Sequence, residues 1–268
     1  MAEPKPFHVA DLPGVGPTAL LVFAGLYAPI LTLVVYSFNA SPSVATWDGF
    51  TFDWYLKAWG NAAVMNAAAN SLIVATLAAV LSTALATLAA LGTTRRPAFF
   101  GITAVYAAIN QPLMVPEIVT AVALLIVVAA IKAATGYAGL GYLVVAHTAF
   151  CIPFAYLPIR ARLEGMDLTL ETAAADLYAS PWQSFRFVTL PQLAPGILAG
   201  GMLAFVTSLD DVVITEFIKS PGQDTLPTYM LGQLRRAMTP DINALSAALL
   251  GLTLVLLSGF FLLSRRKS

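Results

Sequence analysis

The chain has 268 residues, of which 59% are hydrophobic and 10% are charged, and its mean hydropathy is +0.80. This composition is too apolar for an ordinary soluble globular domain of this length, so we expect an integral membrane protein. The 14 basic and 14 acidic residues balance, which gives no indication of a nucleic-acid partner. The single cysteine, Cys151, can form no disulfide within the chain and is predicted to be a small core residue.

Six apolar segments approach the roughly 20 residues that a helix needs to cross the hydrocarbon core of a bilayer. They lie at about residues 18–38, 64–91, 98–131, 139–157, 193–217 and 243–263. The third segment is too long for one straight helix and contains Pro112 and Pro116, so we expect a lead-in followed by a broken or kinked helix. The prediction is an all-α membrane protein with six transmembrane helices.

We divide the chain into an N-terminal segment (1–17), a six-helix transmembrane domain (18–264) and a basic tail (265–268). The first 15 residues are polar and show no signal-peptide pattern, so the first apolar segment is expected to remain as an anchor. A segment that contains LPTYMLGQLRRAM, within residues 218–240, is predicted to form a helix at the membrane surface. Thr239, Pro240 and Asp241 are expected to begin the last span as N-cap, N1 and N2.

The positions of the basic residues predict the orientation of the chain. Six spans place both termini on one side of the membrane. With the termini in the cytoplasm, nine basic residues lie inside and five outside, which agrees with the positive-inside rule. The inside set is Lys5, Arg95, Arg96, Arg160, Arg162, Arg186, Arg265, Arg266 and Lys267; the outside set is Lys57, Lys132, Lys219, Arg235 and Arg236. The loop between the fourth and fifth spans is therefore predicted to be cytoplasmic.

That loop contains a polar stretch, ETAAADLYASPWQSFRFVTLP, from Glu171 to Pro191. Small side chains at Ala173 and Ala174 allow a partner to approach one face of a short helix. Ser180 and Pro181 are suited to the N-cap and N1 positions of a second helix. The stretch is predicted to be a helix-turn-helix to which another protein docks.

The spacing of this stretch resembles the EAA loop of ABC importer permeases, which reads Glu-Ala-Ala, three residues, Gly, nine residues and then Ile-x-Leu-Pro. Thr172 stands at the Glu position, although Glu171 lies beside it, and Tyr178 stands at the Gly position, which leaves open whether the tight turn forms. The resemblance implies a cytoplasmic coupling helix within about residues 164–190 that contacts an ATPase. The implied coupling residues are Glu171, Thr172, Ala173, Ala174, Asp176, Leu177, Tyr178, Ala179, Leu190 and Pro191.

The fifth span contains SLDDVVITEF, with Asp210 and Asp211 adjacent in an otherwise apolar helix. A charged side chain at the bilayer centre costs about 2.5 to 3.5 kcal/mol on insertion scales, so this pair favours a functional role. In a continuous helix, Ser208, Asp211 and Thr215 share one face and form a polar stripe for a hydrated cation. Asp210 would point about 100° away from that face.

Glu117 directly follows Pro116 in the third span and has two interpretations. It is either a carboxylate favoured by the dipole of a restarted helix or, with Asn110, part of the same path as the fifth-span acids. A path of carboxylates and hydroxyls, with no basic residue assigned to it, suits a cationic solute. His147 is predicted to be a buried hydrogen-bonding residue, and we assign neither a metal site nor a catalytic residue.

From Leu203 to Leu249 the chain resembles the spermidine/putrescine importer permeases, specifically the second of their two paralogous membrane subunits. The segments that carry the resemblance are SLDDVVITEF, TLPTYMLGQLRR and TPDINALSAALL. The resemblance implies a type I ABC importer permease in the bacterial inner membrane that moves polyamines. It also implies three partners, namely a paralogous permease, an ATPase dimer and a periplasmic solute-binding protein.

The chain contains no Gly-Lys dipeptide and hence no phosphate loop, so ATP and Mg²⁺ are expected to act on the partner ATPase. The chain is accordingly not expected to be an enzyme. Two alternatives remain open: an ABC permease for another small solute, and an ion-coupled secondary transporter or channel whose acids relay ions. The long alanine-rich loop argues against the second, because a self-contained channel does not need it.

Overall fold

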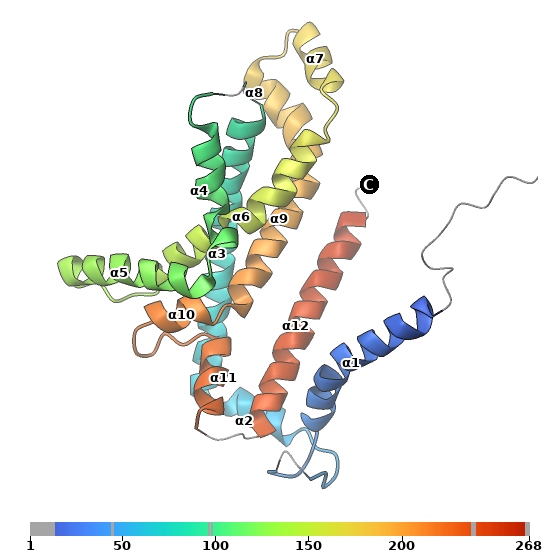
Figure 1. The fold of residues 1–268 in the computed structure, drawn as a ribbon, viewed down its shortest axis with the longest axis vertical. Coiled ribbons are helices and arrows are strands. Elements are labelled where there is room, and N and C mark those ends of the chain that lie inside the picture. Colours follow the sequence, from blue (N-terminus) through green and yellow to red (C-terminus); the bar gives the residue numbers. More distant parts are fainter. Residues whose placement is uncertain (1–13, 44–45, 96, 98, 237–239, 266–268) are drawn as a thin grey trace, which may run out of the picture. The chain divides into compact units, whose positions relative to one another are not determined.

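The computed structural model describes residues 14–43, 46–95, 97, 99–236 and 240–265 (Figure 1). In these ranges the chain is helical, apart from turns, loops and one isolated bridge between Asn39 and Phe50. The helices are α1 (Val15–Tyr36), α2 (Asp53–Gly60), α3 (Ala62–Thr94), α4 (Ile102–Met114), α5 (Glu117–Thr135), α6 (Gly141–Glu164), α7 (Thr169–Asp176), α8 (Pro181–Ser184), the π-helix η2 (Phe185–Thr189), α9 (Leu190–Asp210), α10 (Val213–Ile218), α11 (Leu226–Leu234) and α12 (Pro240–Arg265).

Six helical segments are long and apolar enough to cross a membrane, which confirms the predicted number of spans. They are Val15–Tyr36, Ala62–Thr94, Glu117–Thr135, Gly141–Glu164, Pro181–Asp210 and Pro240–Gly259. The second has 33 residues and is therefore about 50 Å long, which exceeds the roughly 30 Å of the hydrocarbon core. This helix must extend beyond the apolar layer.

The third predicted span is broken, as expected. α4 ends at Met114, Val115 adopts an extended conformation (φ −102°, ψ 138°), and α5 begins at Glu117. The cause is Pro116, because a proline ring disfavours the helical conformation of the residue before it. Figure 1 shows that the chain changes direction at this break.

The fifth predicted span is also broken, and the prediction of one continuous helix there is wrong. α9 ends at Asp210, Asp211 has extended angles (φ −64°, ψ 132°), and α10 begins at Val213. The carboxylate of Asp211 accepts hydrogen bonds from the backbone N–H groups of Ile214 (3.2 Å) and Thr215 (2.9 Å). The side chain thereby satisfies donors at the start of α10 and offers the backbone an alternative to a continuous helix.

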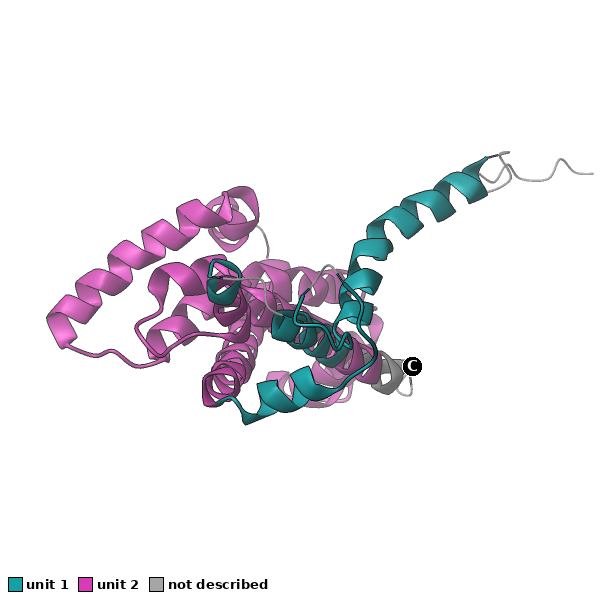
Figure 2. Cartoon of the chain, turned by 90° about the horizontal axis from the view of Figure 1, so that it is seen from below, with its two compact units in different colours: residues 1–61, 232–252 teal, residues 62–231, 253–268 magenta. Residues whose placement is uncertain are grey.

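The chain divides into two compact units (Figure 2). Residues 62–231 and 253–268 form one unit, whose hydrophobic core lies where α3, α6 and α9 pack together. Residues 1–61 and 232–252 form the other. In this second unit the indole N–H of Trp54 donates to the carbonyl of Asn39 (2.8 Å), and the ammonium of Lys57 lies over the Trp54 ring.

The predicted helix in residues 218–240 is α11, and its first residues Leu226, Pro227 and Thr228 are buried. Its location at a membrane surface stays a prediction. α12 begins at Pro240 with Asp241 in its first turn, as expected, whereas the predicted N-cap Thr239 lies outside the described residues.

Close backbone contact joins α6 to α9. A Cβ atom at Gly200 would lie 2.5 Å from the carbonyl oxygen of Ala155, and one at Gly196 would lie 2.7 Å from the Cβ of Arg162. The two glycines are four residues apart and so lie on one face of α9, in the small-xxx-small spacing that lets membrane helices approach closely. Helices α6 and α9 are therefore expected to move as one body.

We predict that Gly200→Val lowers the thermal unfolding midpoint of the detergent-solubilised protein, with a loss of about 1–3 kcal/mol, because the added side chain must separate the two helices. The control is Gly92→Val in α3, where no atom other than those of the neighbouring residues and of the helix's own backbone lies within 4 Å of the added Cβ. Equal unfolding midpoints for both variants would contradict the close contact.

Candidate functional site

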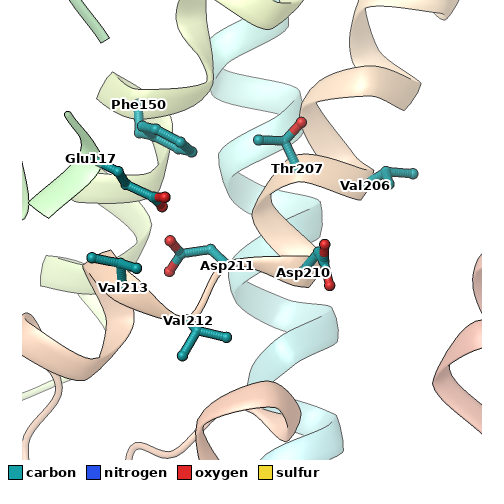
Figure 3. A pocket seen from close by; sticks show the side chains of 8 residues that line it. All are labelled: Glu117, Phe150, Val206, Thr207, Asp210, Asp211, Val212 and Val213. Atoms are coloured by element: carbon teal, nitrogen blue, oxygen red, sulfur yellow. The ribbon is translucent and has the colours of Figure 1, made fainter. Parts of the chain in front are cut away.

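Three predicted path residues line one cavity of about 370 Å³ in the α3–α6–α9 unit (Figure 3). The acids are Glu117 at the start of α5, Asp210 at the end of α9 and Asp211 in the break. The rest of the lining is Phe150, Val206, Thr207, Val212 and Val213. The two helix breaks therefore bring the acids of the third and fifth spans to the same place.

The three carboxylates are not equivalent. Figure 3 shows the carboxyl groups of Glu117 and Asp211 directed toward one another, while that of Asp210 points elsewhere. Asp210 is exposed and Asp211 is only 5% exposed. Glu117 is also the first residue of α5, so both of its sequence interpretations are compatible with its position. Acidic groups grouped in a partly apolar site favour a positively charged occupant.

Asp211 is the most tightly held of the three acids. One oxygen, Oδ2, accepts from the backbone N–H and the hydroxyl of Thr215 at 2.9 and 2.8 Å, and Oδ1 accepts from the N–H of Ile214. The Nε2 atom of His147 lies 3.3 Å from Oδ2. These donors offset the cost of burying a carboxylate.

His147 is fully buried in α6 and is hydrogen-bonded, as the sequence predicts. Its Nδ1 lies 2.7 Å from the Ser208 hydroxyl and its Nε2 lies 2.9 Å from the Thr215 hydroxyl. Ser208 and Thr215 are buried around this ring and do not line the cavity, so the predicted polar stripe for a hydrated cation is wrong. The reason is the break at Asp211, which removes the common helix face.

Asn110, the other predicted path residue, also lies away from the cavity lining. Its amide donates to the carbonyl of Tyr106 one turn earlier in α4 (2.8 Å). Conversely, the contact of His147 with Asp211 was missed from the sequence. The one sequence signal for this contact was the presence of a lone histidine in an apolar span, which does not identify a partner 64 residues away.

The predicted coupling segment, about residues 164–190, has the expected helix-turn-helix form, with α7 followed by α8. Ser180 is the N-cap of α8: its hydroxyl accepts from the N–H of Gln183, the Gln183 side chain accepts from the Ser180 N–H, and Pro181 is at N1. This reciprocal arrangement is a capping box. The predicted start of the second helix is therefore confirmed.

The turn between the two helices forms without glycine. Tyr178 has a φ of 58°, in the left-handed region, and is 97% exposed. The N–H of Tyr178 donates to Ala175 and that of Ala179 to Ala174, at 2.9 and 3.0 Å. This is the hydrogen-bond pattern of a Schellman motif, with tyrosine in the place that glycine usually takes.

Glu171 joins α7 to Arg95, the residue that follows α3, and to Thr189 in η2. Its Oε1 atom accepts from Nη2 of Arg95 at 3.0 Å and from the hydroxyl of Thr189 at 2.9 Å. Thr172, at the Glu position of the motif, is exposed, and its hydroxyl donates to the carbonyl of Leu168. Glu171 is thus engaged within the chain, which differs from its predicted role as a contact to another protein.

The other predicted coupling residues divide by exposure. Thr172, Ala173, Asp176, Leu177, Tyr178 and Pro191 are exposed, and Ala174, Ala179 and Leu190 are half-buried. Large apolar side chains are exposed on this segment: Leu177, Trp182 and Phe187 are 82%, 65% and 70% exposed. An apolar surface of this kind marks a contact site for a protein or a membrane.

Basic residues predicted for opposite sides of the membrane lie at opposite ends of α9. Near its beginning, the guanidinium of Arg162 donates to the carbonyl of Gln192 (2.9 Å). Beyond its end, the ammonium of Lys132 donates to the carbonyl of Ile218 (2.9 Å). Arg162 is in the predicted inside set and Lys132 in the outside set, so the two sets lie at opposite ends of this helix, and which end faces the cytoplasm stays a prediction.

We predict that Glu171→Ala accelerates trypsin cleavage after Arg186 in the detergent-solubilised chain by about two- to fivefold, because a half-exposed ion pair contributes up to roughly 1 kcal/mol. Loss of the carboxylate releases Thr189 and loosens η2, which contains Arg186. Asp176→Ala is the matched control, since it removes an exposed carboxylate from the same helix. Equal cleavage rates for the two variants would refute the predicted role of Glu171.

Residues 82–266 match the family described as binding-protein-dependent transport system inner membrane component. The chain is 40% identical over 235 residues to the putrescine transport system permease protein PotI of Escherichia coli K12. The matched region covers 87% of this chain and 84% of the relative. It is 34% identical over 247 residues to the spermidine/putrescine permease PotC of the same strain, which covers 92% of each chain.

The fold is similar to that of a chain in the crystal structure of a bacterial ABC transporter that imports the acidic polysaccharide alginate. The TM-score is 0.70, the sequence identity is 18%, and 93% of each chain is covered. At this identity the likeness concerns the fold, and the helical architecture of an ABC importer permease extends over nearly the whole chain.

Proposed function

This chain belongs to the family of binding-protein-dependent transport system inner membrane components, and from that membership we propose that it is a permease subunit of an ABC importer for putrescine or spermidine. The observation that carries the substrate class is the cavity lined by Glu117, Asp210 and Asp211, since none of its described lining residues is basic. A polyamine is a chain of ammonium groups joined by methylene groups, and such a cavity complements it.

The cavity lining suits both parts of such a solute. The carboxylates pair with ammonium groups, and such charge-assisted contacts are among the stronger ones in proteins. Phe150 and the valines Val206, Val212 and Val213 offer apolar surface to the methylene groups. An anionic solute would be repelled by the same three acids.

The exposed surface of α7, the turn and α8 is the proposed contact for an ATPase dimer in the cytoplasm. ATP and Mg²⁺ belong to that subunit, because this chain has no phosphate loop. A paralogous permease completes the membrane core, and a periplasmic solute-binding protein supplies the amine; the dependence on a binding protein in the name of the family supports the second of these partners. Both termini are then cytoplasmic.

The arrangement of helices suggests how the two ends communicate. α9 begins directly after the coupling segment and ends at the cavity, and its glycines hold it against α6. Closure of the ATPase dimer moves the coupling segment, the α6–α9 pair transmits the movement, and the break at Asp211 and Val212 absorbs it. The cavity thereby alternates between the two sides of the membrane.

The direct test is ATP hydrolysis and amine uptake by the chain reconstituted in liposomes with its partner permease and ATPase. We expect stimulation by a binding protein loaded with putrescine or spermidine, and the amine that stimulates is the substrate. An ATPase that responds to neither loaded form would overturn the polyamine assignment. Uptake without any ATPase would favour the secondary transporter.

Asp211→Asn removes the charge and keeps the size of the side chain, so we expect amine uptake to fall about tenfold or more while the complex still assembles. Uptake of labelled putrescine at saturating loaded binding protein measures this. The idea of an acidic path fails if the variant transports at the normal rate with the normal dependence on amine concentration.

Ala174→Arg places a long charged side chain on the proposed ATPase contact. We expect ATP hydrolysis that no longer drives uptake, with the amount of purified complex unchanged, because the bulk interferes with docking and not with the membrane core. Ala174→Ser is the matched control that keeps a small side chain. Normal uptake per ATP hydrolysed in the arginine variant would exclude this contact.

A further inference from the structure

His147 connects three separate parts of the structure beside the cavity. It belongs to α6, and it contacts Ser208 in the last turn of α9 (2.7 Å), Thr215 in α10 (2.9 Å) and Asp211 between them (3.3 Å). The ring is fully buried, and the side chain of Asp211 is only 1% exposed. No part of the transport path described above uses this ring.

Counting protons gives the direction of the hydrogen bonds. The hydroxyl of Thr215 has one proton and donates it to Oδ2 of Asp211 (2.8 Å). Thr215 must therefore accept from His147, so Nε2 of the ring carries a proton. The imidazole N–H, the hydroxyl and the carboxylate form a chain of donors that ends on Asp211, and such a chain polarises each of its members.

The contact of His147 differs in kind from the other contacts of Asp211. The N–H groups of Ile214 and Thr215 belong to α10 and move with it. His147 belongs to α6, which the close contacts of Gly196 and Gly200 hold against α9. The ring therefore fixes the carboxylate relative to the α6–α9 pair, across a break where the backbone gives no helical restraint.

We propose that His147 is a positioning residue for amine transport, which keeps the Asp211 carboxylate directed into the cavity and toward Glu117. The proposal rests on the polyamine permease function. His147 does not line the cavity and acts through the Nε2–H, the Thr215 hydroxyl and Asp211. Its essential atom is Nε2, whereas the contact of Nδ1 with Ser208 orients the ring.

A matched pair of variants separates the two ring nitrogens. The side-chain nitrogen of glutamine reaches about as far as Nε2, and that of asparagine about as far as Nδ1. In reconstituted complexes with putrescine-loaded binding protein, we expect His147→Asn to reduce putrescine uptake per ATP hydrolysed roughly tenfold, and His147→Gln to retain most of it. A merely structural polar residue would show equal uptake per ATP in both variants.

Thr215 provides a second pair that does not depend on replacing the ring. Thr215→Val removes the hydroxyl and keeps the shape of the side chain, so uptake per ATP is expected to fall as in His147→Asn. Thr215→Ser keeps the hydroxyl and is expected to retain normal uptake per ATP. In an Asp211→Asn background, His147→Asn should cause no more than about a twofold further loss, because residues that act through one another are not additive.

The wild-type complex distinguishes the two ways in which the idea can fail. If it imports neither putrescine nor spermidine, the polyamine function is wrong and the role of His147 falls with it. If it imports putrescine but the asparagine and glutamine variants are equal, or the losses at His147 and Asp211 multiply, the positioning role alone is overturned.

Discussion

The rest of the site depends on the capping of α10 by a buried carboxylate. Asp211 accepts hydrogen bonds from backbone N–H groups in the first turn of α10. Because its side chain is engaged in this way, α9 ends at Asp210, the residue before it. An ionised carboxylate in an apolar interior is stable only when donors surround it. That requirement brings Thr215 and His147 to the same point and leaves Asp210 at a helix end beside the cavity.

The first half of α9 is governed by a different kind of contact. Glycines at two positions remove the side chains that would keep α6 and α9 apart, so their backbones approach closely. Glu171 then holds α7 to Arg95, which directly follows α3, and to Thr189 in η2. Packing and ion pairing thus make one end stiff, whereas the cavity end has two breaks in its helices.

Local signals made much of the fold predictable, and the site less so. Pro116 disfavours a helical Val115, and Ser180 with Pro181 begins a helix, so both features could be read from the sequence, although Pro112 in the same span stays inside α4. No proline or glycine marks the break at Asp211, which depends on contacts from α10 and from His147 in α6. A helix periodicity therefore grouped Ser208 with Asp211 on a face that does not exist in the folded chain. Asn110 was predicted to line the path, but its amide donates to the carbonyl of Tyr106 in its own helix.

The turn at Tyr178 has a consequence for how such chains are found. Its left-handed conformation costs a residue with a side chain roughly 1–2 kcal/mol relative to glycine, yet the two hydrogen bonds back to α7 close the turn. A tyrosine also has less freedom than glycine in the unfolded chain, which offsets part of that cost. The backbone, and not the identity of this residue, therefore preserves the loop. A sequence signature that insists on glycine here would overlook chains that form a closed turn without it.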